Sequence, residues 1–221
     1  MITLGSDLAN RLRLAAAQFE GVDLSRDGSA LRRELDGVCG SLQERYQGKG
    51  WLEIPGVVET RALYKAIGLD PTKVRPSSEA LLRRVLKGQP LYQVNLLVDT
   101  VNLCSLDFQL SYGVYDLERL TLPIEARLGR PGEAYAGIRK GPVHLEGRIC
   151  LADATGPFGN PSSDAARSAI TVGTREALVV IFAPMEMARE SLAKRLSETV
   201  ERIARLTGAQ PVGPTGSVDR R

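Results

Sequence analysis

The chain has 221 residues, of which 43% are hydrophobic and 25% are charged, an ordinary composition for a globular protein with a full core. Its net charge of +3 is too small to indicate nucleic-acid binding by itself, although it would not repel an RNA. No apolar run approaches the roughly 20 residues that span a bilayer, and the N-terminus lacks the apolar segment of a signal peptide. We therefore expect a cytoplasmic protein without a membrane partner.

Cysteine and histidine are scarce. Cys39, Cys104 and Cys150 are odd in number and far apart, which favours buried thiols over a disulfide framework or a zinc site. His144 is the only histidine in the sequence, so any Ser-His-Asp or Cys-His mechanism would have to use it. The sequence contains no Walker, GxSxG or HExxH motif. We expect neither a metal nor a cofactor.

Hydrophobic periodicity predicts the first elements of the chain in order. Leu12 and Leu14 alternate with arginines, which favours an opening strand, with a helix as the alternative interpretation. Apolar residues at helical spacing then predict a helix over 29–46. A further helix is predicted over 57–67, ended by Gly68.

Two more helices are predicted in the central stretch, residues 75–102. The second should begin near Asn95, a good helix cap. Asn95, Asp99 and Asn102 share one stripe of this helix beside a strongly apolar stripe. Two interpretations stay open: a cap with a solvated face, or the polar wall of a pocket.

The pattern changes to strands after Phe108. Residues 111–113 predict a turn, whereas 121–128 and 143–153 read as strands. The unbroken apolar run 177–183 is typical of a strand that is buried on both faces. A last helix is predicted from Pro184 to Gly208.

Helices come first, strands second and one long helix last, which predicts an α+β fold with a mostly antiparallel or mixed sheet. We expect a single domain over 1–208. Residues 209–221 are rich in Pro and Gly, and we expect a disordered tail there.

Residues 156–164, GPFGNPSSD, are almost all turn formers. The prolines stiffen this loop, and the side chains of Asn160, Ser162, Ser163 and Asp164 can bond nearby backbone. Long, stiff, polar loops between strands often carry function. A surface connection with good turn chemistry is the other interpretation.

Several motifs occur in a characteristic order. They are RPSSEALLRR at 75–84, NLLVDTVN at 95–102, Tyr115-Asp116-Leu117, Gly132-Glu133, a strand ending at Asp153, and TREALVVIFAP at 174–184. Together they resemble the B3/B4 domain, which occurs in the beta subunit of bacterial phenylalanyl-tRNA synthetase and in free-standing proteins. The resemblance covers roughly residues 60–185, and extends to Gly208 for a free-standing member.

The resemblance implies a layered fold with a β-sandwich-like core flanked by helices. It also implies an editing activity, in which tyrosine is hydrolysed from the tRNA meant for phenylalanine. The partner would be an aminoacylated tRNA, with the amino acid moiety bound between the sheet and residues 75–102. In the family pattern Asn95 and Thr174 match pocket residues, and 156–164 matches a loop that enters the pocket.

The sequence departs from the family pattern at one pocket position. Gly113 stands where the family has a histidine, two residues before the aromatic Tyr115. His144 would have to substitute from another strand. The family's Gly-Gly-Glu segment is not matched cleanly either, and Glu146 and Asp164 are candidate replacements for its carboxylate.

The first functional hypothesis is therefore a trans-editing hydrolase, which must position a water, stabilise an oxyanion and select an amino acid. Asn95 and Thr174 would donate hydrogen bonds, and Glu146 would orient water or bind the substrate ammonium. The candidate catalytic residues are Asn95, Thr174 and Glu146, and the candidate substrate-binding residues are Arg75, Asp99, Gly113, His144, Asn160, Asp164 and Arg167.

Each candidate also has a structural interpretation. Arg75 would pair with Glu79, Arg167 would be a solvated charge, and Thr174 would be an ordinary strand residue. The second functional hypothesis is a non-catalytic module that binds an amino acid, a small metabolite or tRNA. The third is a protein–protein adaptor, which predicts an exposed apolar patch on the helices of residues 29–67.

Overall fold

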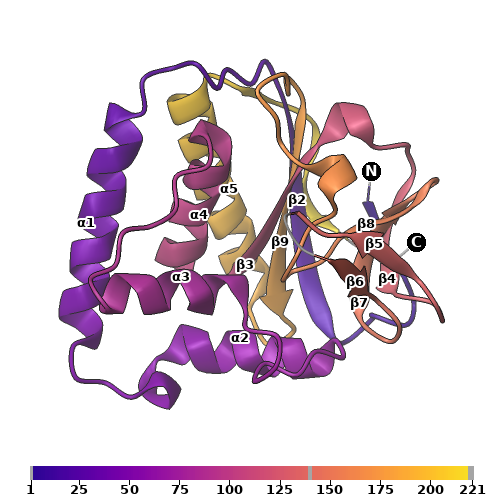
Figure 1. Ribbon diagram of the computed structural model, residues 1–221, viewed down its shortest axis with the longest axis horizontal. Helices are drawn as coiled ribbons and strands as arrows, with labels where there is room; N and C mark the ends of the chain where they lie inside the picture. The colour runs from indigo at the N-terminus through magenta and orange to yellow at the C-terminus, as the bar shows by residue number, and fades with distance from the viewer. Residues whose placement is uncertain (1, 139–140, 219–221) are drawn as a thin grey trace.

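The computed structural model describes residues 2–138 and 141–218, and its helices and strands gather on opposite sides of the molecule (Figure 1). The helices are α1 (Ser29–Tyr46), α2 (Pro55–Ala66), α3 (Ser77–Leu86), α4 (Leu96–Phe108) and α5 (Arg189–Thr207), with 3-10 turns η1 (Trp51–Glu53), η2 (Leu117–Arg119) and η3 (Ala166–Ser168). The strands are β1 (Ile2–Leu4), β2 (Leu12–Glu20), β3 (Ser111–Asp116), β4 (Ile124–Leu128), β5 (Ala134–Ala136), β6 (Pro142–His144), β7 (Ile149–Asp153), β8 (Gly156–Gly159), β9 (Ala177–Pro184) and β10 (Gln210–Val218). No helix in the described part of the chain is long and apolar enough to cross a membrane.

Two four-stranded sheets and a hairpin make up the strand side of the molecule. The first sheet has the order β10-β2-β9-β3, and all of its neighbours are antiparallel. The second has the order β1-β4-β7-β8 and is mixed, because β1 runs parallel to β4. Strands β5 and β6 form the hairpin. The α+β class with antiparallel and mixed sheets is confirmed.

Strand β9 lies at the centre of the fold, and every one of its residues is buried. Successive side chains of a strand point to opposite faces. Leu178, Val180 and Phe182 enter the core between the two sheets. Val179 and Ile181 enter a second core, against α4 and α5. The predicted strand at 177–183, buried on both faces, is confirmed.

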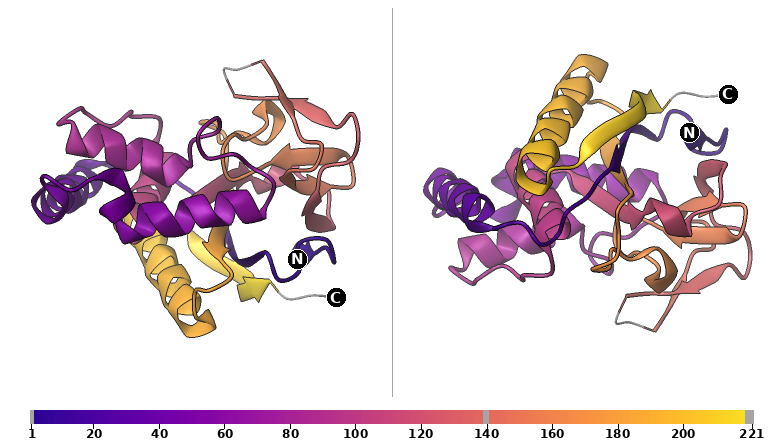
Figure 2. Two further views of the ribbon diagram at one scale, coloured as in Figure 1. Left: turned by 90° about the horizontal axis from the view of Figure 1, so that it is seen from below. Right: turned by 90° about the horizontal axis from the view of Figure 1, so that it is seen from above.

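Of the remaining helices, α1 and α3 pack against α4, and α2 packs against β9 (Figure 2). α1, α2 and α3 share a separate apolar cluster that includes Leu42, Val57, Leu82 and Val85. The helical stripes read from the sequence are the faces that these helices bury. The opening strand and the predicted helices over 29–46 and in the central stretch are present at those positions.

Three local predictions are wrong. Residues 111–113 start strand β3 instead of forming a turn, because each pairs with a residue of β9. The predicted strand at 143–153 is interrupted between β6 and β7, where Gly147 has a φ of +68°. The last helix begins at Arg189, not at Pro184, which still belongs to β9.

The predicted disordered tail is also corrected. Residues 210–218 form β10, which pairs with β2 at the edge of the first sheet. Pro and Gly are tolerated there because an edge strand leaves one row of backbone groups unpaired, and the register shifts between Val212 and Gly216. Residues 219–221 lie outside the described part of the chain.

Glu79 joins α2 to α3 through a buried carboxylate. Arg61 donates to both of its oxygens at 2.7 and 2.9 Å, and Arg83 donates at 2.9 Å. Arg75 lies 3.9 Å away. Burial raises the pKa of Glu79, but the hydrogen bonds from Arg61 and Arg83 outweigh burial and hold the pKa below its usual range.

We predict that Glu79→Gln lowers the free energy of unfolding by about 1.5–3 kcal/mol, because it removes the buried counter-charge of two guanidinium groups that are themselves only partly buried. Denaturant unfolding at neutral pH measures this loss. Glu59→Gln, on the exposed face of α2, is the matched control and should change stability by less than about 0.5 kcal/mol. Equal effects of the two substitutions would contradict the role given to Glu79.

Candidate functional site

A groove of about 720 Å³ opens between α3, the segment that leads into α4, strand β6 of the hairpin, and the loops of the second sheet. We call it the α3 groove. Its polar and charged lining residues are Lys73, Arg75, Ser77, Arg84, Tyr92, Asn102, His144, Arg148, Asn160, Ser162 and Ser163. Its apolar lining residues are Leu69, Val74, Ala80, Leu81, Val94, Pro142 and Val143.

The α3 groove is positively charged. Lys73, Arg75, Arg84 and Arg148 line it, and no Asp or Glu among the described residues does. Arg75 has 54% of its side chain exposed, and its acidic neighbour Glu79 is bound more closely by other arginines. A cleft lined by charges of one sign concentrates ligands of the opposite sign. The chemistry of the groove therefore suits an anionic ligand that also carries an apolar group.

The groove brings together three of the predicted substrate-binding residues: Arg75, His144 and Asn160. Asn160 shapes its own loop, because its side-chain oxygen accepts from the backbone N–H groups of Ser162 and Ser163 at 2.8 and 2.9 Å. His144 is exposed at the end of β6. The predicted functional loop therefore does form one wall of a concave site.

Two contacts fix this loop against the helices. The buried hydroxyl of Tyr64 on α2 donates to the carbonyl of Pro161 at 2.6 Å. Ser77, the first residue of α3, donates to the same carbonyl at 3.2 Å. The groove is thus built where the helical layer meets the second sheet.

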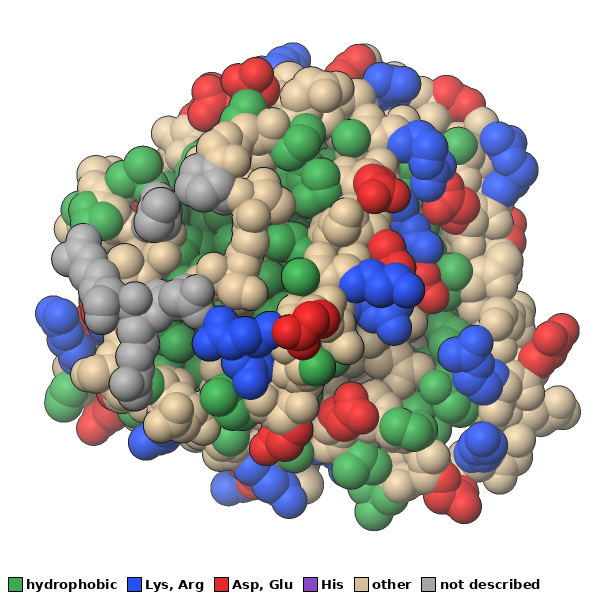
Figure 3. Space-filling view, turned by 180° about the vertical axis from the view of Figure 1, so that it is seen from behind, with side chains coloured by type: hydrophobic (Ala, Val, Ile, Leu, Met, Phe, Trp, Pro, Cys, Tyr) green, Lys and Arg blue, Asp and Glu red, His purple; other side chains and the backbone are tan. Residues whose placement is uncertain are grey.

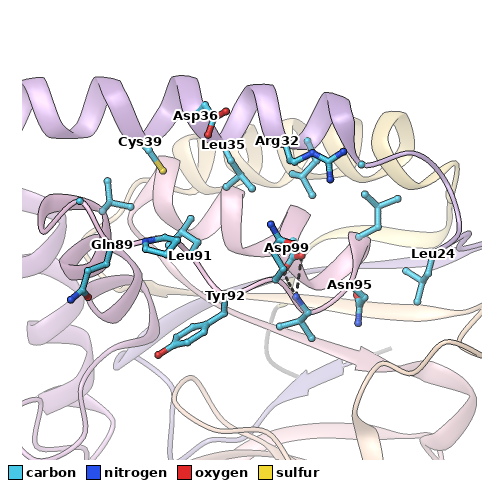
Figure 4. A pocket seen from close by; sticks show the side chains of 18 of the residues that line it. Leu24, Arg32, Leu35, Asp36, Cys39, Gln89, Leu91, Tyr92, Asn95 and Asp99 are labelled. Atoms are coloured by element: carbon cyan, nitrogen blue, oxygen red, sulfur yellow. Dashed lines mark hydrogen bonds between the residues drawn. The ribbon is translucent and has the colours of Figure 1, made fainter.

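A second hollow, of about 630 Å³, lies between α1 and the segment of residues 88–99 (Figure 4). Asn95 and Asp99 line it. The Asn95 side chain accepts from Val98 N at 2.9 Å, so it is the predicted helix cap. Both carboxylate oxygens of Asp99 accept from Val94 N at 3.1 Å, and burial raises the pKa of Asp99. The predicted polar stripe is split, since Asn102 lines the α3 groove instead.

Thr174 lies in neither hollow. Its buried hydroxyl donates to Asp116 at 2.6 Å and accepts from Thr171 N at 2.9 Å, which ties the start of β9 to the end of β3. Glu146 is exposed in the turn before β7 and lines neither hollow. The structure therefore does not bring Asn95, Thr174 and Glu146 together in either of these hollows.

Arg167 is not a solvated charge. It binds Asp153 through both terminal nitrogens, at 2.8 and 3.0 Å, and donates to the carbonyl of Gly156 at 2.8 Å. Burial alone would raise the pKa of Asp153. The hydrogen bonds from Arg167 and nearby backbone N–H groups outweigh burial, and the pKa falls to about 2. These contacts hold the β7–β8 hairpin together.

Gly113 lies under the ring of Tyr115. A Cβ atom at Gly113 would lie 2.1 Å from the Tyr115 hydroxyl, and one at Gly159 would lie 2.4 Å from it. The Tyr115 ring packs edge-on against Phe158, with ring centroids 4.9 Å apart. The phenol therefore fills the space that a side chain at 113 would need, which explains why no histidine fits there.

Asp164 is a buried carboxyl beside this tyrosine. Its Oδ1 atom and the Tyr115 hydroxyl are both buried without an aligned hydrogen bond among the described residues. Burial raises the pKa of Asp164 to about 7, and the nearby Tyr115 hydroxyl and Asn160 N–H offset only part of that rise. Asp164 is the last residue of the loop that forms one wall of the α3 groove, but it does not line the groove itself.

Sequence reasoning missed the other charged and aromatic residues of the groove: Lys73, Arg84, Tyr92 and Arg148. Arg84 belongs to the RPSSEALLRR motif, but helical spacing alone does not show that it turns back onto the following segment. Tyr92 offered one signal, a large aromatic residue in a polar linker between two helices. Only the fold brings residues 142–148 close to the other residues of the groove.

The groove differs in charge from the rear face of the molecule. There, Lys and Arg side chains are interspersed with Asp and Glu over the described surface (Figure 3). On residues 29–67, the large exposed hydrophobic residues are Leu52 and Val58. Two such side chains give little support to an adaptor surface, which requires a contiguous apolar patch.

The α+β layers place a cationic groove between the helices and the strand side of the molecule. The B3/4 domain model matches residues 59–207, so the chain belongs to the B3/4 domain family. A comparison with curated proteins found no match.

A solved structure shows the same fold. It is an N-terminal fragment of the phenylalanyl-tRNA synthetase beta subunit from Pyrococcus horikoshii, with a TM-score of 0.51 and 14% sequence identity. The match covers 96% of this chain and 50% of that fragment, so this chain spans about half its length. At this identity the likeness concerns the fold alone.

We predict that Asp164→Asn changes the pH dependence of stability. The folded pKa of about 7 lies above the ordinary value of 3.8, so its contribution to stability is present at low pH and is lost as pH rises through 7. Unfolding free energies at pH 5 to 8 should fall more steeply for the wild type, by roughly 3 kcal/mol at most. Parallel pH profiles of the two proteins would contradict a buried, neutral Asp164.

Proposed function

We propose that this protein binds the aminoacylated 3′ end of a tRNA in the α3 groove. The observation that carries the proposal is the set of four cationic side chains, Lys73, Arg75, Arg84 and Arg148, in a groove that no described carboxylate lines. Membership of the B3/4 domain family and the likeness to a synthetase subunit fragment support it.

The composition of the groove fits such a ligand. Arginine and lysine bind phosphate oxygens through charge-assisted hydrogen bonds. Leu69, Val74 and Leu81 provide an apolar wall for an amino-acid side chain or a base. The volume of about 720 Å³ is within the roughly 300–1,000 Å³ of ligand pockets. A nucleotide with its attached amino acid is an appropriate size for this space.

Hydrolysis of that aminoacyl ester is a second candidate function, and the position of His144 in the groove favours it. A neutral imidazole can take a proton from water. The water oxygen would bond to the ester carbonyl carbon, the bond from that carbon to the ribose oxygen would break, and His144 would pass the proton to the ribose oxygen. In this reaction His144 would supply an imidazole from a different position than the family histidine, because Gly113 does not line the groove.

The predicted catalytic roles of Asn95, Thr174 and Glu146 remain untested. Each has a structural explanation or an exposed position, as described above. None of these three residues takes part directly in the proposed reaction. The substrate-binding roles of Arg75 and Asn160 are retained, because both line the groove.

We predict that Arg75→Gln with Arg148→Gln weakens binding of an aminoacylated tRNA and lowers its salt dependence. Each lost phosphate contact should reduce the slope of log affinity against log salt by about 0.7 for single-stranded RNA. Fluorescence anisotropy at several salt concentrations measures both quantities. Arg33→Gln with Arg45→Gln, on the exposed part of α1 and outside the groove, is the control matched in charge.

Two results would contradict binding in the groove. One is an absence of tRNA binding by the folded wild type. The other is an equal loss of affinity in the control with Arg33→Gln and Arg45→Gln, which would mean that only the overall charge matters.

We predict that the protein deacylates at least one member of a panel of mischarged tRNAs, beginning with tyrosyl-tRNA specific for phenylalanine. His144→Gln should reduce turnover by about 10²-fold or more if the imidazole carries the proton, while binding changes little. Release of labelled amino acid measures turnover. Turnover that is unchanged in His144→Gln would exclude this role, and absence of turnover across the panel would leave the binding function alone.

A further inference from the structure

The segment of residues 88–95, between α3 and α4, carries an exposed aromatic side chain at the edge of the α3 groove. Tyr92 is 66% exposed, although it lines the groove. It points away from α1 in the close view (Figure 4). Single exposed hydrophobic residues are common on proteins, so the contacts of this ring decide its interpretation.

Arg84 holds the ring in place. Its Nε and Nη2 atoms donate to the carbonyl of Pro90 at 2.9 and 2.6 Å, and Nη1 donates to the Tyr92 hydroxyl at 3.0 Å. The guanidinium carbon lies 4.1 Å from the centroid of the Tyr92 ring. A cation–π contact therefore backs the ring, and most of the side chain still faces solvent.

We propose that Tyr92 is a stacking platform for an unpaired nucleobase of the RNA that occupies the α3 groove, an inference that rests on the proposed function. Aromatic side chains beside a basic groove bind single-stranded nucleic acid, because every base presents a π-face. Bases inside a duplex already stack on their neighbours. The site therefore selects RNA whose end is unpaired over RNA that is fully paired.

The charge of the groove supports this ligand. Lys73, Arg75 and Arg148 line the same groove as Tyr92, so a base on the ring would place its phosphates among cations. An acidic peptide with an aromatic residue would satisfy the charge as well. The flat ring, fixed by three hydrogen bonds from Arg84 to its segment, favours a planar base.

The test uses an RNA stem with a four-nucleotide unpaired 3′ end that carries 2-aminopurine at each unpaired position in turn. Stacking on Tyr92 should quench the fluorescence of at least one of these positions when the wild-type protein binds. Tyr92→Phe keeps the ring and should keep the quenching. Tyr92→Leu keeps apolar bulk without the ring, and should abolish the quenching and weaken binding about tenfold or more.

Arg84→Lys tests the positioning of the ring. It keeps the positive charge but removes the planar group that stacks on Tyr92 and bonds Pro90. We expect it to reduce quenching while the salt dependence of binding stays close to that of the wild type. A blunt stem without unpaired nucleotides should bind wild type and Tyr92→Leu equally weakly.

The outcomes separate this inference from the proposed function. Failure of the folded wild type to bind either these RNAs or an aminoacylated tRNA would overturn both, whereas failure to bind these RNAs by a protein that still binds an aminoacylated tRNA would overturn the platform alone. Binding to the groove with equal affinity and no quenching in wild type and Tyr92→Leu would overturn the platform alone. Tighter binding of an acidic, aromatic peptide than of the RNA would also overturn it, in favour of a protein ligand.

Discussion

The burial of β9 on both faces is the constraint on which the rest of the structure depends. Its backbone is paired on both edges, with β2 and with β3. Its side chains supply both the core between the sheets and the core under the helices. A polar residue on this strand would have to be satisfied inside one of those cores. Because both layers are fixed to one strand, the loops of the second sheet reach the helices at a defined place, and the α3 groove forms there.

A single buried carboxylate lets α3 carry several arginines. Glu79 faces inward and binds Arg61 and Arg83 at hydrogen-bonding distance, while Arg75 lies farther away. Charge is thus neutralised on the inner side of the helix and left on the side that borders the groove. Arg84 extends that positive border to the next segment. The same helix therefore contributes to stability through one face and to the character of the site through another.

Much of the fold could be predicted from periodicity, because burial imposes a period of 3.6 residues on α1 and α3 and leaves β9 uniformly apolar. Strand β10 could not, since its Pro and Gly content resembles a tail and only pairing with β2 orders it. The site was harder to predict. Asn95 and Thr174 are short polar residues whose hydrogen bonds are satisfied nearby, by a helix N-terminus and by Asp116. Residue type and family position do not distinguish a structural hydrogen bond of this kind from contact with a substrate.

The segment between α3 and α4 is held at both ends, which bears on how the groove would bind. Arg84 fixes it at Pro90, and Asp99 fixes it at Val94 N. Tyr92 stands between these two anchors and borders both hollows. Ordering a mobile segment on binding costs free energy for each immobilised side chain. A segment that is already anchored avoids most of that cost, so an exposed ring at this position can hold a ligand more tightly than its small contact area alone would indicate.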